Sequence, residues 1–305
     1  MRRMPWGPQP GDPGLRPWTP PTTQGRAVVL GGGGVTGIAW EAGVIEGLLD
    51  AGVDLLTADT MIGTSAGSVI AAHARSGGLF GAGLDRLFSG EHELPQASLR
   101  TVDGLRFMAA MFVPGDRRNG RTLLGRASVM VADRGHVAAE DVWVAAVGER
   151  LVGAPWPSAR LLITAVDALS GECVVFTKDS GVPLERAMAA SCAVPGIYPP
   201  VTINGRRYVD GGMRTATNVD LARGHDRVVV IAPIPFAVRP KDRPAQQLER
   251  LGPGVRSVLI APDGPSRQAI GRDLLDLSRA AGTLAAGRAQ GRRLAERVRA
   301  VWEPA

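Results

Sequence analysis

Short apolar runs alternate with amphipathic stretches along most of the chain. Runs with the length of buried strands occur at 27–30, 60–62, 161–166, 173–177, 207–209, 227–231 and 257–260. Apolar residues at helical spacing predict helices at 38–49, through 69–72, and at 140–152, 183–191 and 267–302. Because strands that alternate with helices are typical of a parallel sheet covered on both faces, the pattern predicts an α/β fold with a mainly parallel central sheet.

Two regions depart from this pattern. Residues 1–25 are rich in proline and have little periodic apolar content, which predicts a flexible leader. Between about residues 77 and 135 the pattern weakens into short helical pieces beside an arginine-rich stretch at 116–126, and we interpret this region as a cap-like insertion. The remainder, 26–305, is expected to form a single domain that ends in a basic helical segment at 267–302.

Composition narrows the class of protein. A hydrophobic content of 45% with 21% charged residues excludes a mostly disordered chain. No apolar run reaches the length of a membrane span, and the first residues contain no secretory h-region. The two cysteines, Cys173 and Cys192, have no metal-ligand spacing and suit a reducing compartment, so we expect a cytoplasmic protein.

The net charge of +6 permits contact with an anionic membrane surface or with nucleic acid and specifies neither. Aromatic residues make up only 5% of the chain and the arginines are scattered among acids, which argues against nucleic-acid binding.

A serine stands where a strand is expected to turn sharply into a helix. Gly63-Thr64-Ser65-Ala66-Gly67 has the G-x-S-x-G form in this setting. So sharp a turn brings neighbouring segments too close for side chains, so Gly63 and Gly67 flank a serine whose hydroxyl projects from the end of the sheet. We predict that Ser65 is a nucleophile; the alternative is a helix N-cap in a tight turn.

A glycine run follows the first predicted strand and opens the first helix. It satisfies G-x-G-x-x-G, the form of a dinucleotide-binding loop, through Gly32, Gly33, Gly34 and Gly37. A dinucleotide site needs an acidic residue at the end of the next strand, whereas that strand ends in Gly63-Thr64-Ser65 and both Asp50 and Asp54 come too early. The loop can instead aim backbone N–H groups at an oxyanion, or it is simply a tight turn.

An activated serine needs a base. The chain has four histidines, none of them convincingly placed: His73, His92, His136 and His225. His73 follows Ser65 by eight residues on the same predicted helix, a rise of roughly 12 Å, so it cannot bond to the serine directly. Asp210 is the better candidate, because it follows a short strand and its neighbours Gly211 and Gly212 let a second segment approach closely. The alternative is an ordinary Asp-Gly turn.

In their order along the chain, Gly32 to Gly37, Gly63 to Gly67 and Asp210 to Gly212 resemble the three signatures of the patatin-like phospholipases. The segment Ala190 to Val201 also resembles the stretch that precedes the aspartate motif of that family. The resemblance covers residues 26–235 and implies a three-layer α/β/α sandwich. One position departs from the family pattern: many members have Arg or Lys where this chain has Thr36, which weakens any expectation of a phosphorylated substrate.

The resemblance also implies an activity. Ser65 would be the nucleophile and Asp210 the proton acceptor of a Ser-Asp dyad, with the amides of residues 32–37 as the oxyanion hole. It implies no cofactor and no metal, a lipid or other carboxylic ester as substrate, and a serine lipid acyl hydrolase of the phospholipase A type. An acyltransferase or a thioesterase would use the same dyad, and a lipid-binding module without catalysis is the third alternative.

Two further regions bear on a lipid substrate. The segment 267–302 places leucines and valines among many arginines, a pattern typical of helices that rest on an anionic bilayer and also of packed surface helices. It allows peripheral contact with the inner face of a membrane. The Met- and Phe-bearing stretch from Phe107 to Phe112 would line a groove for acyl chains or form ordinary core.

Overall fold

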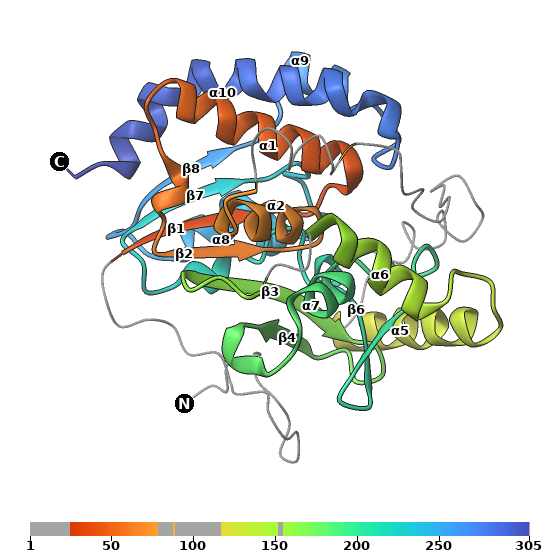
Figure 1. Cartoon of the computed structure of the whole chain (residues 1–305). Coiled ribbons are helices and arrows are strands. Elements are labelled where there is room, and N and C mark those ends of the chain that lie inside the picture. Colours follow the sequence, from red (N-terminus) through yellow and green to blue (C-terminus); the bar gives the residue numbers. More distant parts are fainter. Residues whose placement is uncertain (1–24, 79–87, 89–116, 152–154, 305) are drawn as a thin grey trace. The chain divides into compact units, whose positions relative to one another are not determined.

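The computed structural model describes residues 25–78, 88, 117–151 and 155–304 (Figure 1). The chain divides into two compact units. Of the described residues, the parallel unit comprises 25–78, 88, 157–161 and 215–304, and the antiparallel unit comprises 117–151, 155–156 and 162–214. The single domain therefore stays a prediction, while the expected leader and the stretch from Phe107 to Phe112 lie outside the described residues.

The parallel unit contains four strands that pair in the order β2-β1-β7-β8, all parallel. These strands are β1 (Arg26–Leu30), β2 (Thr60–Gly63), β7 (Arg227–Ile231) and β8 (Arg256–Ile260). Leu30 pairs with both Gly63 and Ile231, and Ile231 pairs with Ile260. The carboxyl ends of the four strands therefore share one edge, where α/β folds place their ligands.

Helices flank this sheet. They are α1 (Gly34–Asp50), α2 (Ala66–Arg75), α8 (Pro244–Glu249), α9 (Gly264–Ile270) and α10 (Ala280–Trp302). The helices α1 and α10 lie side by side in Figure 1, and glycines allow their backbones to approach closely. A Cβ on Gly43 would lie 2.1 Å from the Leu284 carbonyl oxygen, and one on Gly291 would lie 2.3 Å from the Val44 carbonyl oxygen.

The packing of α10 distinguishes between the two interpretations of its basic amphipathic pattern, a helix that rests on a bilayer and a packed surface helix. Val298 and Trp302 on α10 are buried, while Arg288 and Arg292 pair with Asp50 on α1 at 2.7 Å each. The apolar side of α10 therefore contributes to the protein interior, and this helix is a packed surface helix rather than one with an apolar side open to a bilayer.

The prediction of one helix over residues 267–302 is wrong. The helix α9 ends at Ile270, and Gly271 then adopts a φ of +74° and a ψ of −159°, an extended conformation that favours glycine and cannot continue the helix. A 3₁₀ turn at Leu277–Arg279 leads into α10, and the Asp276 side chain caps that turn by accepting a hydrogen bond from the Ser278 amide. The spacing of apolar residues alone does not reveal that the helix is interrupted between α9 and α10.

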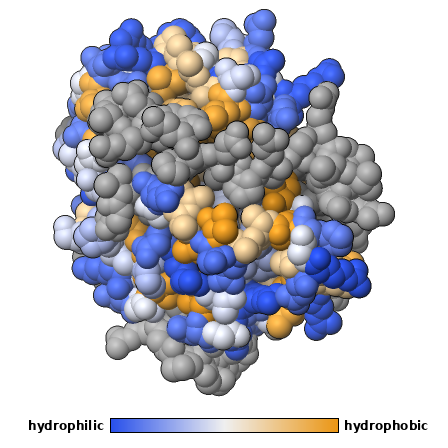
Figure 2. Space-filling model, turned by 45° about the vertical axis from the view of Figure 1, so that its right-hand side comes forward, coloured by the Kyte–Doolittle hydropathy of each residue, from blue (hydrophilic) through white to orange (hydrophobic). Residues whose placement is uncertain are grey.

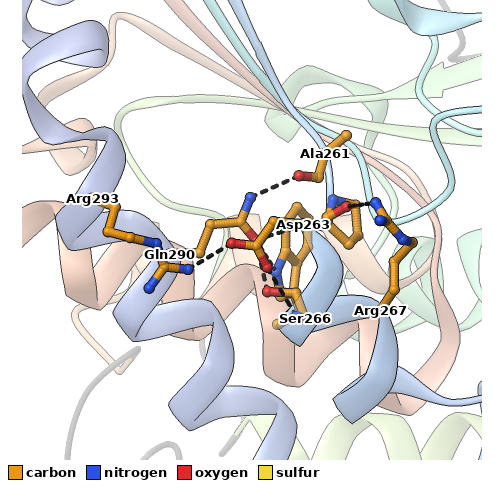
Figure 3. A network of polar contacts seen from close by, with 8 residues as sticks. Ala261, Asp263, Ser266, Arg267, Gln290 and Arg293 are labelled. Carbon is orange, nitrogen blue, oxygen red and sulfur yellow. Dashed lines mark hydrogen bonds and ion pairs between the residues drawn. The ribbon is translucent and has the colours of Figure 1, made fainter.

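A buried glutamine on α10 connects the end of β8 with α9 (Figure 3). Gln290 Oε1 accepts from the Ser266 hydroxyl at 2.7 Å, and Gln290 Nε2 donates to the Ala261 carbonyl oxygen at 2.7 Å. Asp263 caps α9 through the Ser266 amide and pairs with Arg293 at 2.6 Å. These bonds satisfy the polar groups that the helix packing buries.

The antiparallel unit contains antiparallel strand pairs in the order β5-β6-β3, with β4 also pairing β3. Its strands are β3 (Arg160–Asp167), β4 (Cys173–Phe176), β5 (Val201–Ile203) and β6 (Arg206–Asp210), and its helices are α5 (Arg117–Asp133), α6 (Glu140–Leu151) and α7 (Leu184–Ser191). Together the two units confirm the predicted α/β class with a mixed, mainly parallel sheet flanked by helices.

The arginine-rich stretch differs from its prediction. Residues 117–133 form the continuous helix α5 instead of short helical pieces. Contacts of this helix with the turn after β3 explain its length: Arg121 Nε donates to the Gly171 carbonyl oxygen at 2.7 Å, and a Cβ on Gly125 would lie 2.1 Å from the Ala168 carbonyl oxygen. The remainder of the predicted insertion lies outside the described residues, apart from residues 77, 78, 88, 134 and 135.

Candidate active site

Ser65 lies in a strained turn between β2 and α2. Its backbone has φ 52° and ψ −120°, a conformation that is rare for a residue with a side chain, and the residue is half-buried. A Cβ on Gly63 would lie 2.4 Å from Ser68 Cα, and a Cβ on Gly67 would lie 2.2 Å from the Leu30 carbonyl oxygen. Only glycine fits at both positions. Although Ser65 occupies the N-cap position of α2, its side chain makes no capping hydrogen bond, which argues against the N-cap alternative.

The glycine loop, residues 31–34, passes directly beside this serine. A Cβ on Gly32 would lie 3.4 Å from Ser65 Cβ. Gly34 has a φ of +62°, and a Cβ there would lie 2.6 Å from the Leu274 carbonyl oxygen. The two predicted motifs of the parallel unit therefore meet at the carboxyl edge of its strands.

The amides of this loop differ in what they bind. The Gly32 amide donates to the Ala216 carbonyl oxygen at 2.7 Å, and the Gly37 amide donates to the Gly33 carbonyl oxygen at 2.9 Å. Among the described residues, the amides of Gly33 and Gly34 have no acceptor. Of the four glycines predicted to surround an oxyanion, these two have amides that remain able to donate to a ligand.

A segment that sequence reasoning missed holds both loops. Its Ala216 carbonyl oxygen is the acceptor for the Gly32 amide, and Asn218 Nδ2 donates to Thr64 Oγ1 at 3.0 Å. Asn218 is fully buried and has a φ of 53°, and its amide donates to Thr215 Oγ1 at 2.7 Å. The segment 215–218 therefore joins the glycine loop to the residue before Ser65.

Asp210 belongs to the antiparallel unit. It ends β6, pairs with Ala165 of β3, and is 4% exposed. Its Oδ1 accepts from the Gly212 amide at 2.7 Å, and its own amide donates to the Ala193 carbonyl oxygen at 3.0 Å. Ala193 belongs to the segment Ala190 to Val201, which resembles the stretch that precedes the aspartate motif in the family. The meeting of Asp210 with Ser65 stays a prediction.

Comparison with known proteins identifies the family. The profile of the family described as patatin-like phospholipase matches residues 28–223, well over half of the chain. The chain belongs to the patatin-like phospholipase family. The matched residues include the glycine loop, the turn that holds Ser65, and Asp210–Gly212.

Individual relatives are more distant. Two uncharacterized NTE family proteins, from Mycobacterium bovis and Mycobacterium tuberculosis, are each 30% identical over 187 residues, which is 61% of this chain and 42% of theirs. The matched part therefore spans less than half of those relatives. Among solved structures, VipD from Legionella pneumophila matches with a TM-score of 0.42 and 13% identity over 91% of this chain and 67% of that chain. The type III effector ExoU matches with a TM-score of 0.41 and 19% identity over 92% and 54%.

Behind the glycine loop of this patatin-like protein lies a buried acid that the sequence did not reveal. Glu41 on α1 is fully buried, and its Oε1 accepts from the Gly31 amide at 2.8 Å. Burial raises the pKa of Glu41 well above its usual range, because the interior penalises the carboxylate. The Gly31 carbonyl oxygen in turn accepts from the Gly67 amide at 2.9 Å. Glu41 thus supports the peptide that links the glycine loop to the turn around Ser65.

Two of the histidines that the structure describes, His73 and His225, bond to groups outside the candidate site. His73 Nδ1 bonds to the Val69 carbonyl oxygen at 2.8 Å. The two ring nitrogens of His225 bond to the Ala222 carbonyl oxygen and to Thr60 Oγ1, each at 2.9 Å, and burial lowers the pKa of this histidine. His136 is exposed, and His92 lies outside the described residues.

Thr36, which replaces the basic residue of many family members, is turned towards the protein. Its amide donates to the Leu274 carbonyl oxygen at 3.1 Å, and its hydroxyl donates to the same oxygen at 3.4 Å. In the part of the chain that the structure describes, no three His, Cys, Asp or Glu side chains gather as metal ligands, and none of the helices has the length and hydropathy needed to cross a bilayer.

Proposed function

We propose that this protein is a serine lipid acyl hydrolase in which Ser65 and Asp210 form the catalytic dyad. The observation that carries the proposal is the strained, half-buried Ser65 beside a glycine loop, two of whose amides have no acceptor among the residues that the structure describes. Strained backbone of this kind concentrates at functional sites. Membership of the patatin-like phospholipase family supports a lipid acyl ester as substrate.

In the proposed reaction, Ser65 Oγ attacks the ester carbonyl carbon while its proton passes to the Asp210 carboxylate. The amides of Gly33 and Gly34 donate to the resulting oxyanion, which they stabilise more than the ground-state carbonyl. When the tetrahedral intermediate collapses, the carbon–oxygen bond to the leaving alcohol breaks and the alcohol takes the proton. Water then attacks the acyl-enzyme in the same way and releases the fatty acid.

Chain connectivity supports Asp210 as the proton acceptor. Asp210 precedes Thr215 by five residues, and five extended residues span at most about 18 Å. The segment that begins at Thr215 is bonded both to the glycine loop, through the Ala216 carbonyl oxygen, and to Thr64, through Asn218. The aspartate is therefore tethered to a segment that lies against the nucleophile.

The proposal is tested by labelling with a fluorophosphonate probe and by turnover of p-nitrophenyl esters and phospholipids. Wild-type protein should be labelled and active, Ser65→Ala should lose both properties, and Asp210→Asn should lose nearly all turnover. The control is Ser76→Ala, which alters an exposed serine at the other end of α2. Substantial turnover by purified Ser65→Ala would overturn the assignment of the nucleophile.

The same experiment separates the alternatives. A lipid-binding module without catalysis would leave Ser65 unlabelled. An acyltransferase would be labelled, and with an added alcohol or lysolipid it would form the transferred ester in preference to the free fatty acid.

A further inference from the structure

Three exposed apolar side chains lie on two loops of the parallel unit. We call Phe236, Val238 and Leu277 the apolar rim; their exposed fractions are 61%, 54% and 41%. Among the described residues of this unit, the other large hydrophobic side chain with comparable exposure is Leu49. Figure 2 shows hydrophobic side chains interspersed with hydrophilic ones on the face that it draws, so exposure alone decides little. What distinguishes the apolar rim is its position next to the glycine loop.

Both loops of the apolar rim contact the glycine loop. The chain leaves β7 through Pro233, and a Cβ on Gly33 would lie 2.6 Å from Pro233 Cβ. The other loop places the Leu274 carbonyl oxygen against the Thr36 amide, three residues before Leu277. The rim therefore lies on loops that adjoin the glycine loop, whose amides would bind the ester carbonyl of a substrate.

The longer loop is constrained. It contains Pro233, Pro235 and Pro240, which fix φ, and Arg243 Nε donates to the Ala237 carbonyl oxygen at 3.1 Å between the two exposed apolar side chains. A loop that is already ordered loses little conformational entropy when it binds. The exposed Phe236 and Val238 are thus held in place for contact.

Positive charge accompanies these side chains. Residues 234–243 contain Arg239, Lys241 and Arg243 against one acid, Asp242. Lys241 and Arg243 are exposed, whereas Asp242 is buried. Apolar side chains flanked by exposed cations are the chemistry of attachment to an anionic bilayer, in which the apolar groups enter the interface and the cations face lipid phosphates.

We propose that the apolar rim docks this protein on an anionic lipid surface and brings the glycine loop to lipid esters. The inference rests on the proposed lipid substrate. It replaces α10 as the expected membrane contact, because the apolar side of that helix is packed inside the protein.

The test is flotation of the full chain with phosphatidylcholine vesicles, with and without phosphatidylglycerol. Wild-type protein should bind, and bind more strongly to vesicles with phosphatidylglycerol. The double variant Phe236→Ser/Val238→Ser should lose at least about tenfold in vesicle affinity, since two buried apolar side chains are removed from the contact. Lys241→Gln should reduce only the preference for the anionic vesicles.

The matched control is Leu49→Ser. Leu49 follows Gly34 by fifteen residues along α1, a distance of about 22 Å, so it lies far from the rim and should leave vesicle binding unchanged. All variants should keep wild-type rates of fluorophosphonate labelling and of soluble short-chain ester turnover. If wild-type protein bound vesicles but was not labelled by the fluorophosphonate probe, the proposed hydrolase activity would be refuted and the docking proposal would stand.

Three outcomes would overturn the docking proposal. Wild-type protein that binds neither kind of vesicle would do so, as would a double variant that binds as strongly as wild type. The third is a result from light scattering: wild type is a dimer, whereas the double variant is a monomer that still binds vesicles. This result would assign the rim to contacts between copies of the chain.

Discussion

Asn218 connects the turn around Ser65 to the segment that follows the aspartate motif. Its side chain donates to Thr64 Oγ1, and its backbone has a positive φ of 53°. Asparagine tolerates that conformation better than most residues, and glycine adopts it freely. Replacement by glycine therefore removes the side-chain hydrogen bond to Thr64 Oγ1, together with the one that Asn218 Oδ1 accepts from the Thr215 hydroxyl, without adding backbone strain.

We expect Asn218→Gly to lower kcat for a soluble ester by about ten- to a hundredfold, with KM little changed, because small displacements of a nucleophile are costly. The measurement is steady-state kinetics together with the rate of fluorophosphonate labelling. Asn204→Gly is the control: Asn204 has a φ of 51°, is exposed, and lies in the turn between β5 and β6. Equal losses in both variants would show that Asn218 has no positioning role.

Among the helices, the close approach of α1 and α10 depends on glycines from both partners. Gly291 on α10 faces the Val44 carbonyl oxygen, whereas Gly282 on the same helix has no atom within 4 Å of an added Cβ. The first glycine allows helix packing, and the second only weakens the helix.

The two glycines predict opposite effects of the same substitution. Gly291→Ala should lower the free energy of unfolding by about 1–3 kcal/mol, because the new methyl group would overlap rigid backbone. Gly282→Ala should raise it by about 0.5–1 kcal/mol through helix propensity. Urea denaturation of both variants measures the difference, and a stabilised Gly291→Ala would contradict the described helix contact.

For the molecule as a whole, the sequence predicted what depends on local patterns. The strands β1, β2 and β7 and the turn around Ser65 follow from apolar runs and glycine positions. The break after Ile270 was missed, because Gly271 lies within an otherwise helical pattern. Burial of polar residues was also missed: glutamate is a residue type that is rarely buried, and only the fold shows that Glu41 lies behind the glycine loop.

Buried titratable groups also link the stability of the whole molecule to pH. The pKa of Glu41 is raised in the folded state, so the folded protein holds this proton more tightly than the unfolded chain does. The stabilisation that follows is complete below the unfolded pKa of Glu and is lost as pH rises through the folded value. His225 behaves in the opposite way, because its lowered pKa makes stability fall as pH drops below the unfolded value of histidine.

Glu41→Gln isolates the first of these effects. The amide stays neutral at all pH values and its oxygen can still accept from the Gly31 amide. Its NH₂ group takes the place of the neutral acid's hydroxyl, at the position where Glu41 Oε2 has no hydrogen-bond partner among the described residues. The two proteins should therefore differ little in stability near pH 5. As pH rises towards about 8, wild type should lose stability relative to the variant, because the unfolded chain ionises Glu41 whereas the folded protein keeps it protonated. Urea denaturation over this range, with the exposed Glu249→Gln as control, measures the change. Parallel curves of stability against pH for wild type and Glu41→Gln would mean that Glu41 is not a buried neutral acid. The acceptor for the Gly31 amide would then be an ionised carboxylate.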